Sequence, residues 1–278
     1  KKIAIVGHGF VGKATESIVK ENVVKKIIDP KYNNNIKDLE GFNPEFIFVC
    51  VPTPMGNSGQ NGKIIEQVID EISNLEIQPT IVIKSTVIPN ILENISKKIT
   101  NVVYNPEFLR EKHAHEDFVN SSFIILGGEN HNLEKVKIFY EENTICKTNN
   151  FIFTDLFRAS LAKYTINTFL ASKVLFFNTI NELFIKENYS NKEWKDFIEI
   201  IANDERVGSS HMDVPGHDGR KGFGGACFPK DIDALIKFGK LKNVDLSLLK
   251  TIQSLNNEIR SQYKVETERE IEQDIEFN

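Results

Sequence analysis

Short runs of consecutive apolar residues recur along the first half of the chain, separated by stretches in which apolar residues follow a helical spacing. The runs are Lys2–Val6, Lys26–Ile28, Phe46–Val51, Thr80–Ile83, Val102–Tyr104 and Phe123–Leu126. Such runs are typical of strands buried on both faces, and strands that alternate with helices predict a doubly wound parallel sheet. We therefore expect an α/β domain over residues 1–153.

The pattern changes in the second half of the chain. One long helix is predicted from Thr154 or Asp155 to about Glu187, with apolar residues on nearly every side. A helix that is apolar all round is buried between domains or subunits. We predict an all-α domain over residues 154–260, and a charged surface tail or arm over residues 261–278, where apolar side chains are few.

Composition excludes several classes of function. The 278 residues carry a net charge of -5 with both signs interspersed, which argues against a nucleic-acid partner. No apolar run reaches the length of a membrane span, and the first residues have no targeting character, although a residue or more is expected to be missing before Lys1. Cys50, Cys146 and Cys227 are scattered, which fits a reducing compartment. We expect a soluble, cytoplasmic protein.

The first apolar run leads directly into a glycine-rich turn. The turn is Gly7-His8-Gly9-Phe10-Val11-Gly12, and helical spacing follows it. Between a strand and a helix, Gly7 permits the tight turn, Gly9 lets the backbone approach a pyrophosphate, and Gly12 lets the helix pack on the strand. Asp29 ends the second run, about 20 residues further on, where an acid binds a ribose hydroxyl and repels a 2′-phosphate. The pattern predicts a Rossmann domain for NAD, with a turn that binds no cofactor as the alternative.

Polar turns follow three of the predicted strands. They are Val51-Pro52-Thr53-Pro54, Lys84-Ser85-Thr86-Val87 and Asn105-Pro106-Glu107-Phe108-Leu109-Arg110-Glu111. Ligands of doubly wound sheets bind outside the carboxyl ends of the strands, so these turns are expected near the site. Asn105 and Pro106 predict a helix start, which places Glu107 and Glu111 on one face. Their repulsion could tune one of them as a general base, although the spacing alone favours a solvated acidic face.

A second glycine-rich stretch lies far along the chain. It reads Gly222-Phe223-Gly224-Gly225-Ala226-Cys227-Phe228-Pro229-Lys230-Asp231. Glycines let backbone lie against a ligand, while Pro229 and Asp231 suit the first turn of a helix. The positive end of that helix, together with Lys230, favours the thiolate of Cys227, so we expect a reactive cysteine. An inert, buried cysteine behind a simple turn is the alternative.

Two further pairs of side chains are candidates for catalysis or metal binding. Lys163 and Asn167 are four residues apart in the long predicted helix and project from one face. A buried lysine needs a partner or a function, whereas a lysine at a helix edge extends into solvent, and the pattern leaves both open. His211 and His217 lack further ligands at a suitable spacing, so no metal site is predicted.

These motifs, taken in order and together with Arg206-Val207-Gly208, resemble those of the UDP-glucose/GDP-mannose dehydrogenase family over residues 2 to about 260. The resemblance implies an NAD-dependent, four-electron oxidation of the C6 alcohol of a nucleotide sugar to a carboxylate, with UDP-glucose to UDP-glucuronate as the first choice. Members usually carry a further C-terminal α/β domain that holds much of the nucleotide. The chain therefore resembles a short form without that domain, or a truncated one.

The resemblance also implies roles for the reactive side chains. Cys227 would attack the aldehyde to form a thiohemiacetal and then hold a thioester. Lys163 and Asn167 would donate hydrogen bonds to the oxygen that becomes negative, and Asp231 would act with Lys163 in positioning the water or proton acceptor. Glu111 would activate the water that hydrolyses the thioester.

Binding roles follow from the same resemblance. Thr86 would help to hold the hydrolytic water, and Arg206 would reach the active site of a neighbouring subunit in a homodimer formed by the helical domain. The remaining residues implied at the substrate are Glu107, Phe108, Leu109, Phe223 and Gly224. Those implied at NAD are Gly7, Gly9, Phe10, Val11, Gly12, Asp29, Val51, Pro52, Thr53, Ser85, Thr86 and Lys230.

Two other functions stay open at this point. A two-electron dehydrogenase of the 3-hydroxyacid type has the same layout and a helical Lys-x-x-x-Asn pair, but it needs no cysteine nucleophile. A non-catalytic NAD-binding scaffold would have lost sugar binding together with the further domain. The catalytic motifs are shared among relatives with different bases and sugars, so the substrate itself is not specified.

Overall fold

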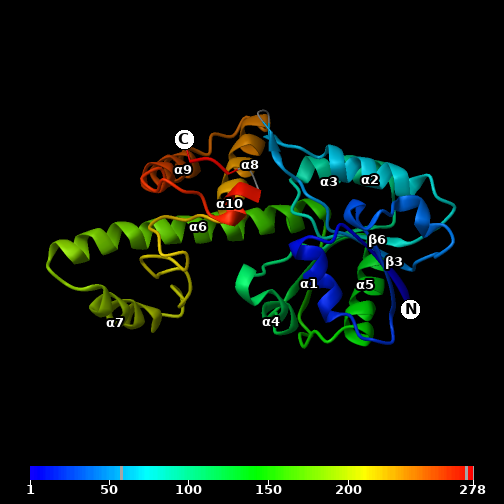
Figure 1. Cartoon of the computed structure of the whole chain (residues 1–278), viewed down its shortest axis with the longest axis horizontal. Coiled ribbons are helices and arrows are strands. Elements are labelled where there is room, and N and C mark those ends of the chain that lie inside the picture. The colour runs from blue at the N-terminus through cyan, green and yellow to red at the C-terminus, as the bar shows by residue number, and fades with distance from the viewer. Residues whose placement is uncertain (57–58, 273–274, 278) are drawn as a thin grey trace. The chain divides into compact units, whose positions relative to one another are not determined.

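The computed structural model of the chain describes residues 1–56, 59–272 and 275–277, apart from the side chains of Glu111, Arg269 and Glu272. The described residues form two compact units (Figure 1). Unit 1 holds residues 1–56 and 60–163, and unit 2 holds Gly59 and the described residues from Tyr164 on. The predicted order, a Rossmann-type α/β domain followed by helices, is confirmed.

Unit 1 is built on a seven-stranded sheet with the strand order β2-β1-β3-β6-β7-β8-β9. The strands are β1 (Lys2–Val6), β2 (Val24–Ile28), β3 (Phe46–Val49), β6 (Thr80–Ile83), β7 (Val102–Tyr104), β8 (Ile124–Gly128) and β9 (Phe151–Thr154). Every predicted apolar run forms one of these strands. Neighbouring strands are parallel except β7 and β8, which pair antiparallel, so the sheet is mostly rather than wholly parallel. A separate two-stranded ribbon pairs β4 (Met55–Gly56) with β5 (Gly59–Gln60).

Helices cover both faces of the sheet in unit 1 (Figure 1). On one face lie α2 (Lys63–Ser73) and α3 (Pro89–Lys98), and on the other lie α1 (Phe10–Ile18) and α5 (Asn130–Asn143). Because side chains alternate along a strand, Ile3 and Ile5 of β1 point to the same face and pack in one core cluster with residues of α1 and α5. The short elements are η1 (Pro30–Tyr32), η2 (Ile36–Leu39), η3 (Glu111–His113) and α4 (Ala114–Val119).

Unit 2 is all helical in the part that the structure describes. Its helices are most of α6 (Leu156–Lys186), α7 (Asn191–Ala202), α8 (Phe228–Leu241), α9 (Ser247–Arg260) and α10 (Glu268–Glu272). The boundary lies between residues 163 and 164 rather than between 153 and 154, because the first two turns of α6 pack on unit 1. There Ser160 Oγ donates a hydrogen bond of 2.7 Å to the carbonyl of Val87.

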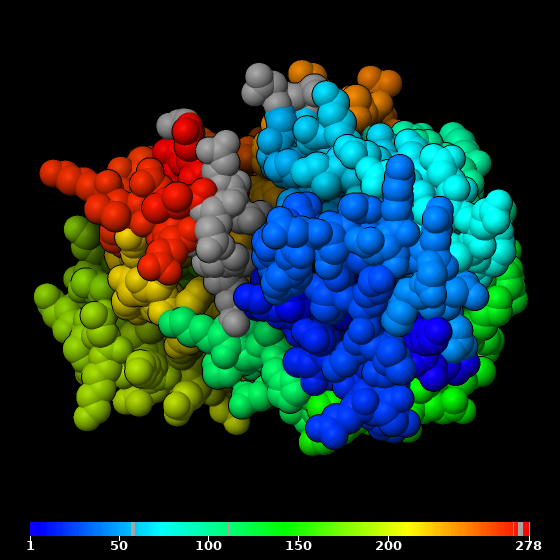
Figure 2. Space-filling view, turned by 45° about the vertical axis from the view of Figure 1, so that its right-hand side comes forward, coloured from blue at the N-terminus to red at the C-terminus, as the bar shows by residue number. Residues whose placement is uncertain are grey.

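The segment expected as a surface tail is partly buried in unit 2. Glu270 of α10 is fully buried and Ile275 is buried, while residues 273, 274 and 278 lie outside the described residues. The start of α10 has a capping arrangement in which the backbone N–H of Thr267 donates to the Glu270 carboxylate at 2.7 Å. In Figure 2 this segment, in red, lies on the surface of unit 2 beside the yellow loop that precedes α8.

One predicted element is absent from the described structure. Residues 105–110 form no helix, and regular structure resumes only with η3 at Glu111, so Glu107 and Glu111 do not share a helix face. The reason is that the side chain of Asn105 is buried under the sheet and is not free to cap a helix. Its Oδ1 accepts hydrogen bonds from Lys84 Nζ at 2.9 Å and from the Tyr140 hydroxyl at 2.6 Å.

Among the helices that the structure describes, none combines the length and the apolar character needed to cross a membrane.

Candidate active site

The glycine turn after β1 has the backbone geometry that its sequence predicts. Gly7 has a φ of +86°, and a Cβ atom there would lie 2.7 Å from the carbonyl oxygen of Cys50. A Cβ atom on Gly12 would lie 2.1 Å from the carbonyl oxygen of Gly7, so helix α1 can start here only with a glycine. At Gly9, the residue before α1, a Cβ atom would meet nothing within 4 Å. The turn is therefore closed on its inner side and open at Gly9.

Asp29 ends β2 beside this turn. Its carboxylate accepts hydrogen bonds from the backbone N–H of His8 at 2.6 Å and of Lys31 at 3.1 Å. Burial alone would raise the pKa of Asp29, but these two hydrogen bonds and the charge of Lys31 outweigh it and hold the pKa below its ordinary value. The His8 ring is itself fixed between the Tyr32 hydroxyl at 2.8 Å and Glu16 Oε2 at 2.7 Å.

The turns after β3 and β6 are joined to each other at the same edge of the sheet. Ser85 Oγ donates to the carbonyl of Val51 at 2.7 Å, and Thr53 Oγ1 donates to the carbonyl of Thr86 at 2.7 Å. Because β1, β3 and β6 are adjacent and parallel, the carboxyl ends of these strands bring the turns next to the glycine turn. Around them, Phe10, Val11 and Thr86 are half-buried, Pro52 is exposed, and Val51, Thr53 and Ser85 are buried.

These residues fit a dinucleotide. The tight turn at Gly7 and the open position at Gly9 leave room for a pyrophosphate against the backbone. The ionised carboxylate of Asp29 can accept a hydrogen bond from a ribose hydroxyl. The structure thus brings the predicted NAD residues of unit 1 together at one sheet edge. Lys230, the remaining one, belongs to unit 2.

A second cluster in unit 1 surrounds Lys163, which is 2% exposed. Lys163 Nζ donates a hydrogen bond to the backbone carbonyl of Glu107, lies 3.8 Å from Glu107 Oε1, and sits 4.9 Å from the centroid of the Phe108 ring. The other carboxylate oxygen of Glu107 accepts from the backbone N–H of Leu109 at 2.7 Å. Of the two alternatives for Lys163, the structure therefore shows the buried lysine with a partner, and that partner is Glu107.

Beneath this cluster lies a buried lysine that the sequence analysis did not single out. Lys84 is 1% exposed, and besides Asn105 its Nζ contacts the Tyr140 hydroxyl at 3.5 Å and lies 4.6 Å from the ring of Phe118. Burial lowers the pKa of Lys84 to about 8, against the raising influence of Cys50 and Glu107. The sequence carries only a weak sign of this burial. Lys84 directly follows the buried strand Thr80–Ile83, so its side chain starts from the end of an internal strand.

In unit 2 the second glycine stretch ends at the first turn of α8. Cys227 is the residue before the helix, it is half-buried, and its carbonyl accepts from the backbone N–H of Asp231 at 2.9 Å. Asp231 is 1% exposed; its Oδ2 accepts from Asn167 Nδ2 at 2.6 Å, and its Oδ1 lies 3.3 Å from Lys230 Nζ. Among the described residues no hydrogen bond reaches Asp231 Oδ1. One face of α6 and the start of α8 thus present a cysteine, a carboxylate and an amide.

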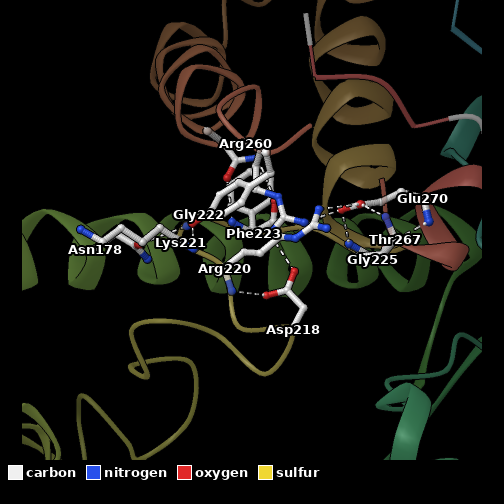
Figure 3. A network of polar contacts seen from close by, with 12 residues as sticks. Asn178, Asp218, Arg220, Lys221, Gly222, Phe223, Gly225, Arg260, Thr267 and Glu270 are labelled. Atoms are coloured by element: carbon white, nitrogen blue, oxygen red, sulfur yellow. Dashed lines mark hydrogen bonds and ion pairs between the residues drawn. The ribbon is translucent and has the colours of Figure 1, made fainter. Parts of the chain in front are cut away.

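The loop before Cys227 is held by side chains from distant parts of the chain (Figure 3). Gly222 N–H donates to Asn178 Oδ1 at 3.0 Å, and Phe223 N–H donates to Asn256 Oδ1 at 2.7 Å. Asn256 Nδ2 donates back to the carbonyl of Phe223 at 2.9 Å. Phe223 is consequently buried, and Gly224 is half-buried.

Arg206 and the side chain of Leu109 stay outside these clusters, and Glu111 is not described beyond its backbone. The side chain of Arg206 is 90% exposed and pairs with Asp204 at 2.6 Å. Glu111 begins η3, and its side chain lies outside the described residues. Leu109 is half-buried and joins the core cluster of unit 1.

The remaining cysteines do not resemble reactive ones. Cys50 is buried, and burial raises its pKa to about 12. Burial likewise raises the pKa of Cys146. Across the described ranges, no group of three or more His, Cys, Asp or Glu side chains is placed to hold a metal ion.

Comparison with known proteins gives two matches to family descriptions. Residues 21–144 match the NAD binding domain, and residues 158–258 the central domain, of the UDP-glucose/GDP-mannose dehydrogenase family. The UDP-glucose 6-dehydrogenase of Rickettsia felis is 36% identical over 235 residues, which cover 82% of this chain and 50% of that protein. The chain spans about half the length of the curated relatives it matches first.

Two solved structures share the fold. A UDP-glucose dehydrogenase from Pyrobaculum islandicum gives a TM-score of 0.72 at 22% identity, covering 92% of this chain and 67% of that one. A 3-hydroxyisobutyrate dehydrogenase from Mycobacterium tuberculosis gives 0.73 at 14% identity, covering 94% of each. At these identities the likeness shows the fold alone, whereas the two domain matches, in order, show that the chain belongs to the UDP-glucose/GDP-mannose dehydrogenase family.

Proposed function

We propose that the chain carries the catalytic apparatus of an NAD-dependent nucleotide-sugar 6-dehydrogenase, which oxidises a C6 alcohol to the carboxylate in two steps. UDP-glucose, converted to UDP-glucuronate, is the first substrate to test. The observation that carries the proposal is the arrangement in unit 2, where the half-buried Cys227 precedes α8 and the buried Asp231 follows one turn later. Asp231 Oδ1 accepts no hydrogen bond from the described residues and lies 3.3 Å from Lys230 Nζ.

The overall chemistry balances with water and two oxidant molecules. One alcohol, two NAD⁺ and one water give one carboxylate, two NADH and three protons. NAD supplies the hydride acceptor for both oxidations, and the residues at Gly7, Gly9, Gly12 and Asp29 are those that would hold it. The chain itself must take up the alcohol proton, trap the aldehyde and admit a water.

Asp231 and Lys163 have surroundings suited to the first step. Asp231 Oδ1 can hold a water or the alcohol hydroxyl because its other oxygen is already fixed by Asn167. Lys163 is buried in unit 1, where its Nζ donates to the Glu107 carbonyl and lies 3.8 Å from Glu107 Oε1. We assign it to the developing oxyanion on the strength of the family resemblance. In this role Lys163 and Asn167 act from successive turns of α6.

Cys227 acts in the second step. Its thiolate adds to the aldehyde carbon, which forms the C–S bond of a thiohemiacetal, and loss of hydride from that carbon leaves a thioester. Water then attacks the thioester and releases the carboxylate and the thiolate. We assign Glu111 as the base that activates this water, with Thr86 holding it, on the strength of the family resemblance.

The stoichiometry of NADH formation tests the proposal most directly. The protein is mixed with NAD and a panel of UDP- and GDP-sugars, and NADH absorbance is compared with sugar consumed. Two NADH per sugar is the expected result. One NADH per sugar supports a two-electron dehydrogenase, which the fold likeness to 3-hydroxyisobutyrate dehydrogenase keeps as the second candidate. No NADH with any sugar supports an NAD-binding scaffold.

Replacement of the cysteine separates the two enzymatic candidates. Cys227→Ser should abolish the second oxidation, because a serine hydroxyl is a far weaker nucleophile, while Cys146→Ser is the matched control. Wild-type protein quenched during turnover should carry a mass adduct on Cys227, detectable by peptide mass spectrometry. Full turnover by Cys227→Ser would exclude the covalent mechanism.

We also propose that the chain forms a homodimer through α6. Phe169, Phe176 and Leu183 recur every seventh residue, so they line one stripe of the helix, and they are 64%, 60% and 62% exposed. A second copy with two-fold symmetry is the occupant that such a stripe favours. The exposed Arg206 could then act on the partner's site. Light scattering should give a dimer for wild type and a monomer for Phe176→Glu.

A further inference from the structure

The loop before Cys227 is unusual in how its backbone donors are satisfied. Besides the N–H groups of Gly222 and Phe223, that of Arg220 donates to Asp218 Oδ1 at 3.0 Å, and that of Lys221 donates to the Tyr263 hydroxyl at 2.9 Å. The N–H of Gly225 donates to Glu270 Oε1 at 3.3 Å. These five loop N–H groups thus donate to side-chain oxygens rather than to the backbone carbonyls of a strand or helix.

Two of these acceptors lie beyond all the motifs that suggested a function. Tyr263 and Glu270 belong to residues 261–277, which the composition predicted as a charged tail. The Glu270 side chain is fully buried, and the figure of the network shows its carboxylate directed at the loop (Figure 3). Burial of a charged carboxylate is costly unless an opposite charge or hydrogen-bond donors surround it, so Glu270 requires such partners.

The partners of Glu270 form a cluster of charged side chains. Glu270 Oε1 accepts from Arg260 Nη2 at 2.6 Å, and Glu270 Oε2 lies 3.8 Å from Arg220 Nη1. Arg260 is fully buried and also donates through Nη1 to Asp218 Oδ2 at 2.7 Å. Two guanidinium groups and two carboxylates therefore balance, and both guanidinium groups lie over the ring of Tyr263, at 5.2 and 5.7 Å.

The two oxygens of Glu270 have separate partners. Oε2 accepts from the backbone N–H of Thr267 and so caps its own helix, α10. Oε1 serves the loop, through Gly225 and Arg260. A Cβ atom on Gly224 would lie 2.4 Å from Oε1 and 2.3 Å from Arg260 Nη2, so this glycine leaves the space that the pair fills. Glycine at 224 and the acid at 270 are thus matched to each other.

We propose that Glu270 is a positioning residue for the nucleophile: it fixes Gly225, two residues before Cys227, and with Arg260 and Tyr263 it holds the loop in the shape that presents the sulfur. Tyr263 and Glu270, from the stretch predicted as a tail, accordingly help to shape the loop of the proposed nucleophile. The inference deepens the proposed function and rests on it only for the role of Cys227, because the loop geometry stands without it.

Hydrogen exchange of the full-length chain tests the inference without any substrate. Glu270→Ala removes both the hydrogen bond that caps α10 and those to Gly225 and Arg260. Glu270→Gln keeps the size of the side chain but not its charge. Charge-assisted hydrogen bonds of this kind, when lost, should speed exchange in peptides spanning 220–228 by about tenfold, while peptides of unit 1 keep wild-type rates. Alkylation of Cys227 by iodoacetamide should also become faster, because the half-buried sulfur is uncovered.

Two variants serve as controls on the same short helix. Glu268→Gln changes an exposed acid of α10 and should leave both rates unchanged. Thr267→Val removes the hydroxyl that accepts from the Glu270 backbone and also hydrogen-bonds the Glu270 carboxylate, so it removes side-chain capping contacts of α10 while Gly225 and Arg260 keep their acceptor. If the loop rates in Thr267→Val match those in Glu270→Ala, Glu270 acts only by capping α10 and the inference is wrong.

Tyr263→Phe keeps the experiment decisive if Glu270→Ala does not fold. It removes only the oxygen that accepts from Lys221 and keeps the ring under the arginines, so it should speed exchange at that end of the loop. Wild-type exchange and alkylation in folded Glu270→Gln and Tyr263→Phe would overturn the proposal. Absence of NADH with every sugar, with loop exchange altered as expected, would instead count against the proposed function alone.

Discussion

The chain has two glycine-rich turns with predicted binding roles, one in each unit, and they are held in place by different means. The turn at Gly7–Gly12 is fixed by backbone atoms, since those nearest to a Cβ on Gly7 or Gly12 belong to the backbone of Cys50, just after β3, or of Gly7 itself. The loop at 220–225 is fixed by side chains of Asn178, Asn256, Tyr263 and Glu270, up to 45 residues distant along the chain.

This difference separates two ways of building a binding site. Where two backbone segments lie in contact, only glycine fits, so the positions that need it form a recognisable sequence pattern. Side-chain acceptors for loop N–H groups can come from any element that folds nearby. Substitutions should therefore be most damaging at the glycines in the first turn and at remote polar residues for the second.

The largest effect is expected from Gly12→Ala. The new Cβ atom would approach the Gly7 carbonyl oxygen to 2.1 Å, and only backbone movement can relieve that contact. Overpacking of this kind costs about 3 kcal/mol or more, and NAD binding should be lost. Gly9→Ala adds the same methyl group where nothing lies within 4 Å, so its stability should be that of wild type while its NAD affinity falls. NADH fluorescence titration and thermal unfolding separate the two, and equal melting temperatures would break the steric account of the first turn.

Asn256→Ala should have the next largest effect. It leaves both the N–H and the carbonyl of the buried Phe223 without partners, which costs roughly 3 kcal/mol for the two groups together. Ser254→Ala, at an exposed position of the same helix, is the control. Chemical denaturation measures the difference. A loss below about 1 kcal/mol would mean that water replaces Asn256 and that the loop does not depend on it.

Lys84 tests whether unit 1 also depends on long-range polar contacts. Its pKa of about 8 when folded lies below the ordinary 10.5, so between these values the unfolded chain binds a proton that the folded chain does not. Stability from this group therefore rises as pH rises from about 8 to 10.5, by on the order of 3 kcal/mol. Unfolding of wild type and Lys84→Met at pH 7.5 and 10 should show this rise only in wild type. Lys63→Met, which changes an exposed lysine of α2, should behave as wild type.

The smallest effect on stability is expected at Arg206. Its side chain is exposed and pairs only with Asp204 among the described residues, so Arg206→Ala should leave the melting temperature unchanged. If the residue serves a partner's site, turnover should nevertheless fall. Mixing Arg206→Ala with Cys227→Ser subunits should then restore part of the activity. Unchanged turnover in Arg206→Ala would remove this residue from the proposed mechanism.

The helix predicted at Asn105 shows why part of the site escaped prediction. Asparagine followed by proline is a good local helix start, yet the structure uses that side chain to satisfy Lys84 and Tyr140 under the sheet. Capping is worth about 1 kcal/mol, whereas a buried lysine left without partners costs considerably more. The hydrogen bonds of Asn105 to Lys84 and Tyr140 therefore outweigh helix capping. As a result, Glu107 lies beside Lys163 and does not share a helix face with Glu111.

The sequence alone determined six of the seven strands of the main sheet, the sheet class, the first glycine turn and the position of Cys227 before a helix. These features rest on the periodicity of apolar residues and on backbone sterics, which leave recognisable patterns in short stretches of sequence. Only the tertiary structure decided that Lys84 is buried, that α6 starts on unit 1, and that Glu270 lies against the loop of Cys227. A charged residue reads as solvated until its partner is known, and Arg260 and Glu270 become partners only when α9 and α10 have folded together.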